Sequence, residues 1–456
     1  MGLLDVSFDA EWLMQWLRAP ARQKPPSSLP GLRYPSRRDE PVKSSALWLQ
    51  GKREDDGAEG LWRVHDDLYD LSGWLDQHPG GADWLQLTKG TDITEAFEAY
   101  HISQLPEQIL GSYRVRDAVT KRNSPYTFKE DGFYRTLKRR VRRELGDQRS
   151  GPTAESKLCA DALLAATLAS ASFAAAAPSL AAGAASGLLL ALTVIAAHNF
   201  FHQRDNFRMH YFNLSFMSAR DWRVSHGLSH HIYTNTVLDL EMSITEPFLQ
   251  WLPEPSKGWI ARYLSWLYSP FVYSAIFHSQ LLVRVYLFLR GEKKMFGAQD
   301  LFSVLVPGAM LLAGSSLAGA LWMWLWILLV GSFFFGLIGL NAGHHHPDMF
   351  HDGDAPREDT DWGLCQLDAV GERREVNTCT LFALVSFGHH SLHHLFPSLD
   401  HGRLQRLYPA LEATCREFGA ACQVSSLWGM LRGQFLQLAR NKPNRRPRWR
   451  RAGLAE

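Results

Sequence analysis

Formal charge is missing from two long parts of this 456-residue chain. No Asp, Glu, Lys or Arg occurs in residues 162–203 or 301–347. A helix crosses a bilayer with about 20 apolar residues, so each charge-free part is long enough for a hairpin of two spans. We therefore predict four transmembrane helices, at about residues 158–177, 180–199, 301–318 and 320–342.

Cysteine and net charge are also scarce. The five cysteines show no paired short spacing, which argues against a disulfide framework and a cysteine zinc site and favours a reducing, cytosolic environment. The net charge of +2 gives no support for a nucleic-acid partner. Residues 1–9 lack the basic start and long apolar core of a signal peptide, so we expect the N-terminus to stay in the cytosol.

Basic residues flank the outer ends of the predicted hairpins. They occur at 138–143, at 204–223 and in the tail at 445–451, whereas both hairpin turns are uncharged. The positive-inside rule then places both termini and the segment between the hairpins in the cytosol. Residues 259–289 are apolar but interrupted by Arg262, Pro270, His278 and Arg284. We predict that they lie on the membrane surface and do not form a fifth span.

Composition changes divide the chain into five parts. Residues 1–45 form an N-terminal segment and linker, with a short helix expected over 5–18. Residues 46–120 form a compact mixed module, and residues 121–157 form a basic linker. Residues 158–440 form the membrane domain, and residues 441–456 form a basic tail.

Histidine is concentrated in the second half of the chain. Sixteen of the nineteen histidines follow residue 197, and most of them lie in four groups, at 198–202, 226–231, 344–346 and 389–394. The predicted topology brings all four groups to the cytosolic ends of the spans. His65 lies in a polar turn, and we expect it at the surface. His210, His278, His351 and His401 lie outside the four groups, and for each of them a ligand role and an ordinary surface or core position stay open.

The spacing within the groups is typical of metal ligation. His198 and His202 are four residues apart, so on a helix both rings face one ion, and HGLSHH repeats that pair. HSLHH carries an i,i+3 pair, and a doubled histidine suits two adjacent metals because neighbouring helical side chains diverge. Nitrogen ligation without cysteine excludes an iron–sulfur cluster and suits Zn, Cu, Fe or Ni. Eight or more histidines exceed the need of one ion.

The segments HNFFH, HGLSHH and HSLHHLFP resemble the three histidine boxes of the membrane fatty-acid desaturase and hydroxylase superfamily. The resemblance covers roughly residues 155–420 and implies two non-haem iron ions at the cytosolic face. By motif, the implied ligands are His198, His202, His226, His230, His231, His390, His393 and His394. The segment after the fourth span resembles an additional ligand site in which Asn341 and His345 take part, with His344 as the alternative to His345.

Residues 62–101 resemble a cytochrome b5 domain. His78 stands in the HPGG motif and His101 ends the AFEAYH segment. The resemblance implies that these histidines are the two axial ligands of haem b, which then carries electrons and has no site for oxygen. The predicted fold is therefore an α+β cytochrome b5 domain fused to an all-α membrane desaturase domain with four transmembrane helices and a cytosolic di-iron cap.

The resemblance also implies the reaction and its partners. We expect a multi-pass membrane enzyme, in the endoplasmic reticulum, that desaturates a fatty acyl chain of acyl-CoA or an acyl lipid with dioxygen. Cytochrome b5 reductase would supply the electrons. The third box begins with His390, where front-end desaturases with a cytochrome b5 domain usually have Gln. The first two boxes are similar to those of the arthropod cytochrome b5-related proteins. A fatty acid or sphingolipid hydroxylase and a membrane-bound cytochrome b5 electron carrier are the alternatives.

Overall fold

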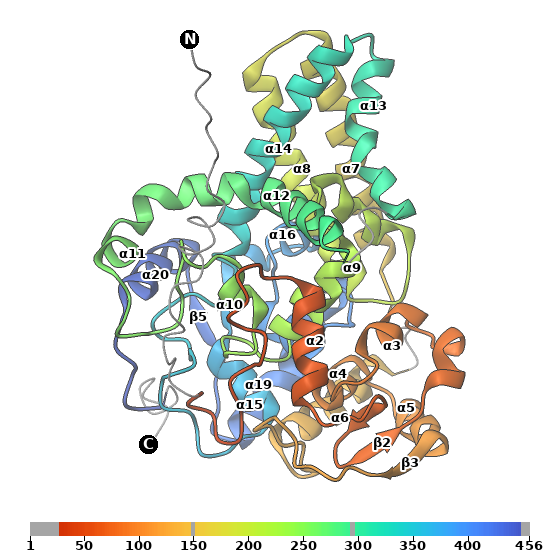
Figure 1. The fold of residues 1–456 in the computed structure, drawn as a ribbon, viewed down its shortest axis with the longest axis vertical. Helices are drawn as coiled ribbons and strands as arrows, with labels where there is room; N and C mark the ends of the chain where they lie inside the picture. Colours follow the sequence, from red (N-terminus) through yellow and green to blue (C-terminus); the bar gives the residue numbers. More distant parts are fainter. Residues whose placement is uncertain (1–26, 147–150, 292–296, 448–456) are drawn as a thin grey trace, which may run out of the picture.

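The computed structural model describes residues 27–146, 151–291 and 297–447. The helix expected over residues 5–18 and most of the basic tail lie outside these ranges. An apolar column of helices projects from a broad body, and a small mixed module packs against one side of that body (Figure 1).

The small module contains the only three-stranded sheet in the described residues. Its antiparallel strands are ordered β1-β2-β3, and Trp62 of the sheet packs with Leu71 and Leu85 in a separate apolar core. Helix α2 (Ser45–Asp55) precedes the sheet. The other elements are β1 (Trp62–Val64), β2 (Asp67–Tyr69), η1 (Ser72–Gln77), α3 (Ala82–Thr88), α4 (Thr94–Tyr100), α5 (Leu105–Leu110), η2 (Gly111–Tyr113) and β3 (Arg114–Asp117). The predicted α+β module is confirmed.

Two long apolar helices form the first hairpin of the column, α7 (Ala154–Ala176) and α8 (Leu180–Phe201). The hydroxyls of Thr153 and Ser179 cap their first turns, and Pro178 stands in the predicted turn between them. Glycines let α8 approach α14 (Leu317–Gly339) closely: a Cβ added to Gly187 would lie 2.8 Å from Val330 Cβ.

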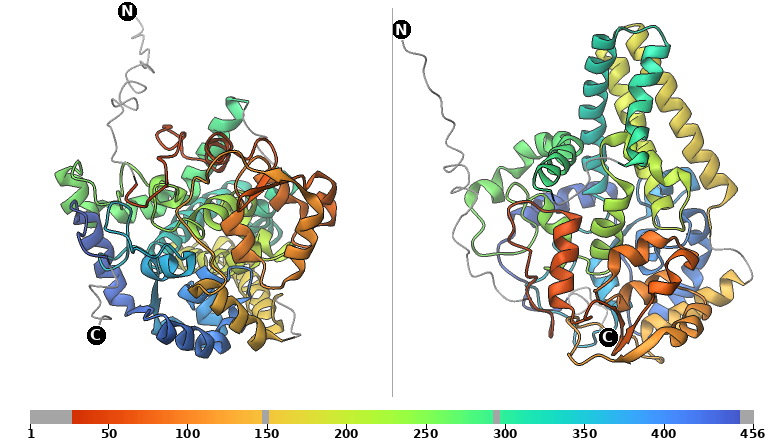
Figure 2. Two further views of the ribbon diagram at one scale, coloured as in Figure 1. Left: turned by 90° about the horizontal axis from the view of Figure 1, so that it is seen from below. Right: turned by 45° about the vertical axis from the view of Figure 1, so that its right-hand side comes forward.

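The second hairpin differs from its prediction. Residues 298–312 form a short 3-10 helix, η5 (Ala298–Val304), and the eight-residue α13 (Leu305–Leu312), which are shorter than a span. Four described helices are long and apolar enough to cross a membrane: α7, α8, α12 (Ser265–Leu289) and α14. Helix α12, which follows α11 (Trp259–Tyr263), does not join the column but lies across its base (Figures 1 and 2). The number of long apolar helices is as predicted, but α12 takes the place of residues 301–318.

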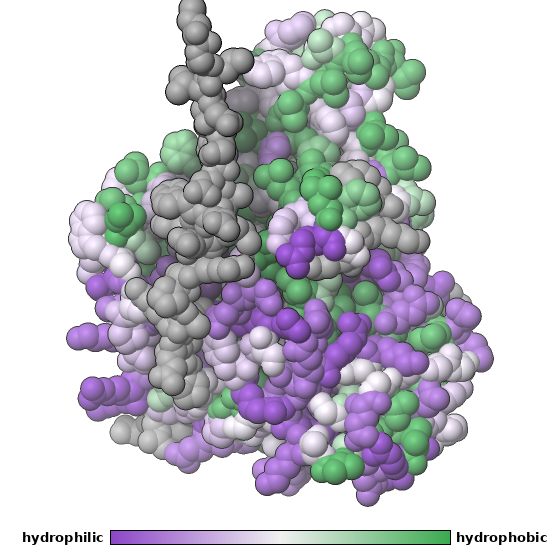
Figure 3. Space-filling model, in the orientation of Figure 1, coloured by the Kyte–Doolittle hydropathy of each residue, from purple (hydrophilic) through white to green (hydrophobic). Residues whose placement is uncertain are grey.

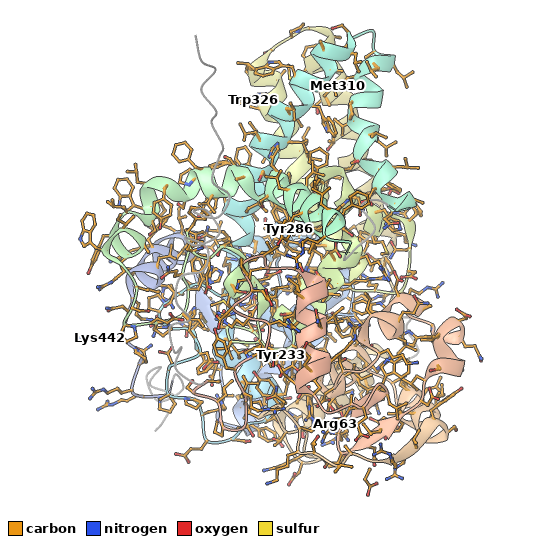
Figure 4. All side chains as sticks on the ribbon, in the orientation of Figure 1. Arg63, Tyr233, Tyr286, Met310, Trp326 and Lys442 are labelled. Atoms are coloured by element: carbon orange, nitrogen blue, oxygen red, sulfur yellow. The ribbon has the colours of Figure 1, made fainter. Side chains whose placement is uncertain are left out.

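Apolar side chains mark the column on the molecular surface. Green, apolar atoms predominate on the projecting part and purple, polar atoms on the body (Figure 3). Met310 of α13 and Trp326 of α14 lie within the column, whereas Tyr286 lies on α12 at its base (Figure 4). The indole of Trp326 donates to Leu180 O at 2.9 Å and so joins α14 to the first residue of α8.

The body is built mainly from short helices, because its chain returns repeatedly to one buried centre. Strands β4 (Gly371–Arg373), which is buried, and β5 (Gln423–Ser425), which is partly exposed, pair in parallel in the body. The remaining elements are α6 (Phe133–Leu145), η3 (Phe207–Ser215), α9 (Ala219–Trp222), η4 (Arg223–His230), α10 (Leu240–Ile244), α15 (Trp362–Ala369), η6 (Arg374–Val376), α16 (Thr380–Val385), α17 (His390–Leu395), α18 (His401–Leu404), η7 (Gln405–Leu407), α19 (Tyr408–Glu417) and α20 (Leu427–Ala439).

The expected basic linker, residues 121–157, contains a packed helix. Helix α6 buries Phe133, Leu137 and Val141 along one face. On its other side, Lys138 and Arg135 form ion pairs with Glu98 of α4, which is fully buried. These basic side chains therefore bind the small module to the body.

A second buried link joins the small module to the body. Lys52 donates to the hydroxyl of Tyr233, and this hydroxyl donates to Glu95. Arg122 pairs with Asp92 and Glu95 beside them. Because these groups are buried and mutually paired, the module is held in one place.

Candidate metal centre and haem pocket

The two histidines of the small module face each other. His78 follows η1, and His101 follows α4. Their ring centroids are 6.1 Å apart. Their Nδ1 atoms are engaged by the carbonyls of Gly81 at 2.9 Å and Phe97 at 3.0 Å, which leaves both Nε2 atoms free for a metal. An iron bonded to both Nε2 atoms at about 2.0 Å would separate the centroids by about 6 Å, so the pair fits a bis-imidazole haem.

Backbone geometry forms the loop that carries His78. Gly81 has φ +109°, a conformation that favours glycine, and a Cβ there would collide with Asp205 of the body. Burial lowers the pKa of His101 to about 4, so its imidazole is neutral and can act as a ligand.

A first group of five histidine nitrogens converges at the base of α8. His198 Nε2 lies 2.8 Å from His226 Nε2, 2.9 Å from His202 Nε2 and 3.2 Å from His393 Nε2. His231 Nε2 lies 3.0 Å from His226 Nε2. All five side chains are buried, and their candidate ligand atoms lie within 4.8 Å of one another.

A second group lies directly beside the first. Its members are His230, His344 and His394, with the Nε2 atoms of His230 and His344 3.1 Å apart. His390 joins it through a 2.7 Å separation between its Nε2 and that of His344. The doubled histidines of both boxes divide between the groups, with His231 and His393 in the first and His230 and His394 in the second.

A π-helical turn decides how the second box divides. Residues 223–230 form the π-helix η4, and His231 N donates to His226 O at 2.8 Å. In this helix residues i and i+5 share a face, so the Nε2 atoms of His226 and His231 meet, and His230 is directed to the other group. We expected the i,i+4 pair to share one ion, and the structure differs because the turn is wider than an α-helical turn.

The third box also differs from the expected i,i+3 pairing. In α17 the i,i+4 residues His390 and His394 lie in the second group, and His393 lies alone in the first. Helical spacing explains this, since residues four apart share a face more closely than residues three apart. His198 and His202, in contrast, lie together in the first group as their spacing predicts.

The structure brings His344 into the cluster and turns His345 away. His345 stacks on Trp251 with ring centroids 3.6 Å apart and planes 10° apart, and its Nδ1 has no hydrogen-bond partner among the described residues. Asn341 is buried; its amide nitrogen donates to Leu337 O, and its Oδ1 likewise has no partner in the described ranges. His344 is therefore geometrically the better ligand.

The separations between the nitrogens indicate how they would hold metal. Adjacent Nε2 atoms in both groups are 2.7–3.2 Å apart. Around an ion with metal–nitrogen bonds of about 2.1 Å, neighbouring ligands are about 3.0 Å apart in an octahedron and about 3.4 Å apart in a tetrahedron. Burial lowers the pKa of His226, His231 and His393 well below the usual range, so neutral lone pairs face one another. The donor set fits six-coordinate cations.

Groups behind the ligands orient their rings. Glu241 accepts from His226 Nδ1 at 2.8 Å, and Asp239 accepts from His230 Nδ1 at 2.9 Å. These hydrogen bonds favour the tautomer in which Nε2 is free to bind metal. Neither carboxylate was predicted from the sequence, although two acidic residues in the short apolar segment after a histidine box are a signal that could have indicated them.

Other groups connect the third box to α8. Asn199 donates to Asp400, and its Oδ1 accepts from His401 Nδ1 at 2.9 Å. His401 is buried with its ring centroid 4.5 Å from that of His393, so it packs directly against a member of the cluster. Among the other histidines outside the cluster, His389 contacts the Tyr408 hydroxyl, and His65 bonds to Glu98.

Comparison with known proteins agrees with this architecture. A family model described as "Fatty acid desaturase" matches residues 171–426, and one described as "Cytochrome b5-like Heme/Steroid binding domain" matches residues 50–119. The chain belongs to the fatty acid desaturase family, whose members are oxidoreductases, and carries a cytochrome b5 domain before the desaturase domain.

Three relatives illustrate the two parts of the chain. A cytochrome b5-related protein of Drosophila melanogaster is 43% identical over 423 residues, which cover 91% of this chain and 96% of the relative. Delta(5) fatty acid desaturase A of Dictyostelium discoideum is 25% identical over 423 residues, covering 78% of this chain and 84% of the relative. A nitrate reductase (NADH) of Brassica napus is 41% identical over 69 residues, covering 15% of this chain and 8% of the relative.

Proposed function

We propose that this chain is a membrane di-iron enzyme that desaturates fatty acyl chains with dioxygen and receives electrons through its own cytochrome b5 domain. The observation that carries the proposal is the pair of convergent histidine groups at the base of the apolar column, next to the facing pair His78 and His101. Iron held there would supply the activation of dioxygen needed to cleave an unactivated C–H bond.

The proposed iron ligands follow the two groups. One iron is assigned to the first group, listed as His198, His202, His226, His231 and His393. The other iron is assigned to His230, His344, His390 and His394. Asn341 lies three residues before His344, and its Oδ1, which has no partner among the described residues, would contribute to binding of this iron. His345 keeps a structural role against Trp251. His78 and His101 are assigned to haem b.

The matched neighbours His344 and His345 test this ligand set. His344→Ala should lose about half of the non-haem iron or more, whereas His345→Ala should retain it, because only His344 Nε2 faces the cluster. Iron per haem is measured in both purified variants. Loss of iron from His345→Ala alone would reverse the assignment.

The proposed membrane position follows from the apolar surface. The column would enter the bilayer, α12 would lie at its surface, and the body with both histidine sites would face the cytosol. The proposed location is the endoplasmic reticulum, where cytochrome b5 reductase would reduce the haem. The substrate is an acyl chain of acyl-CoA or of a membrane lipid.

Two measurements test the function. Purified full-length protein should contain two non-haem irons per haem, and cells that produce it should gain an acyl chain with a new double bond. If the cells instead gain a hydroxylated lipid without a new double bond, the reaction at this centre is hydroxylation and not desaturation. Haem without further iron, and no changed lipid, would overturn the proposal in favour of an electron carrier.

A further inference from the structure

Tyr100 connects the two histidine sites directly. It ends α4 and immediately precedes His101, one of the two facing histidines of the small module. Its hydroxyl lies 3.1 Å from His202 Nδ1 and 3.2 Å from Gly227 O in the π-helical turn. One residue of the small module is thus adjacent in sequence to a proposed haem ligand and hydrogen-bonded to a proposed iron ligand.

The hydrogen-bond directions at Tyr100 are determined by the cluster. His202 Nε2 faces His198 Nε2 at 2.9 Å, so a neutral His202 that offers Nε2 to a metal carries its hydrogen on Nδ1. That N–H donates to the Tyr100 oxygen, and the phenol then donates its own hydrogen to Gly227 O. Tyr100 has the same relation to His202 as Glu241 has to His226 and Asp239 has to His230.

Contacts around Tyr100 hold the small module in this position against the body. The Tyr100 ring lies 5.1 Å from that of Trp84, and the guanidinium of Arg223 lies over Trp84 at 4.8 Å. Ser398 donates to Tyr100 O at 2.9 Å. The loop after His78 is attached as well, because Asp205 N donates to Gly80 O at 3.2 Å.

We propose that Tyr100 is a positioning residue that orients His202 and holds the haem module against the iron cluster, so that electrons pass between them in this docked arrangement. The inference rests on the proposed function. With both groups bound, each transfer would oxidise ferrous haem to ferric haem and reduce one non-haem iron from ferric to ferrous, while the Tyr100 phenol would keep its proton and its electrons. A module that moved freely on a linker would not depend on this residue.

Flash reduction of the haem tests the inference without turnover. Full-length protein with oxidised irons is held under argon, the haem is reduced by a photo-excited flavin, and the ferrous haem band is followed as it decays. We expect Tyr100→Phe to slow this decay at least about tenfold, with an unchanged haem spectrum. The rate constant is compared separately from the amplitude, because loss of non-haem iron lowers the amplitude of the decay and not its rate constant.

Two further variants complete the design. Tyr113→Phe is the control: Tyr113 belongs to the same module but packs on Trp74. In this variant the ferrous haem band should decay at the wild-type rate. Gly227→Ala should reproduce the effect of Tyr100→Phe, because the added Cβ would lie 2.8 Å from the Tyr100 hydroxyl and displace it.

The outcomes separate this inference from the proposed function. Wild-type decay in Tyr100→Phe, in protein that retains its non-haem iron and oxidises lipid, overturns the role of Tyr100 and leaves the proposed function intact. Wild-type protein that holds no non-haem iron overturns the proposed function, and with it the inference.

Discussion

The two histidine sites differ in how far apart their parts lie along the chain. The haem pair comes from one small module, and each ring is held by a backbone carbonyl of its own turn, Gly81 for His78 and Phe97 for His101. The metal cluster draws nitrogens from α8, η4, α17 and the segment after α14. Side-chain carboxylates and not backbone carbonyls hold its rings, as Glu241 does for His226 and Asp239 for His230. A local motif can hold two ligands, whereas two metals need the tertiary fold.

This difference predicts that haem and non-haem iron can be lost independently of each other. A change in the cluster should remove non-haem iron and leave the haem, because the small module has its own core and its own ligand supports. A change in the haem pair should do the reverse.

The largest effect is expected from His393→Ala. His393 is the one residue of the third box in the first group, so its loss opens that group and should abolish lipid oxidation. The haem absorption spectrum should be unchanged. Lipid product and haem spectrum are measured on the same preparation, and retained lipid oxidation would remove His393 from the ligand set.

His78→Ala should remove the haem band while non-haem iron remains. Lipid oxidation driven by NADH and reductase should fall severely, because the internal donor is lost. Added soluble cytochrome b5 should restore little activity, since the haem-free module still occupies the docking site around Tyr100. Full restoration by soluble cytochrome b5 would show that the docked arrangement is not required.

Asp239→Asn should lower metal affinity without removing a ligand. An amide orients His230 less strongly than a carboxylate does, and changes of this kind cost about 10–100-fold in metal affinity. Iron retained during chelator titration gives the measurement. Asp348→Asn is the control, since that carboxylate is 60% exposed and contacts His346 outside the cluster.

Glu98→Ala should loosen the attachment of the haem module with both metal sites still formed. The change leaves Lys138 and Arg135 without their buried partner, which costs about 3 kcal/mol or more in the free energy of unfolding. Urea unfolding followed at the haem band measures it. Glu130→Ala is the matched control, since Glu130 pairs with Arg135 while 75% exposed, and it should cost about 1 kcal/mol or less.

The same carboxylate predicts a pH dependence. Burial raises the pKa of Glu98, but the hydrogen bond from His65 and the charges of Lys138 and Arg135 lower it more, from 4.5 to about 2. Its contribution to stability is therefore complete above about pH 4.5 and is lost as the pH falls toward 2. Glu98→Ala should flatten that part of the stability profile, and an unchanged slope would contradict the assignment.

Much of the fold followed from periodicity and spacing. The first hairpin, with its turn at Pro178, and the small module around His78 and His101 depend on local signals, and they were predicted closely. The second hairpin was less well predicted, because the lack of charge in residues 301–347 does not reveal that the helix stops after Leu312. The packing of the basic segment before the first hairpin could not be predicted from its charge, since the buried partner of Lys138 lies on α4.

The histidine boxes show the same limit at the level of single residues. The candidate histidines could be recognised from their order along the chain, because clustered imidazoles beside apolar spans have few other uses. Their division into two groups depends on the fold, through the π-helical turn at residues 223–230 and the orientation of His344 and not His345 toward the cluster. A metal site requires the lone pairs of its ligands to converge within about 3 Å. Backbone turns and long-range packing set the direction in which each imidazole points, and spacing along the chain does not.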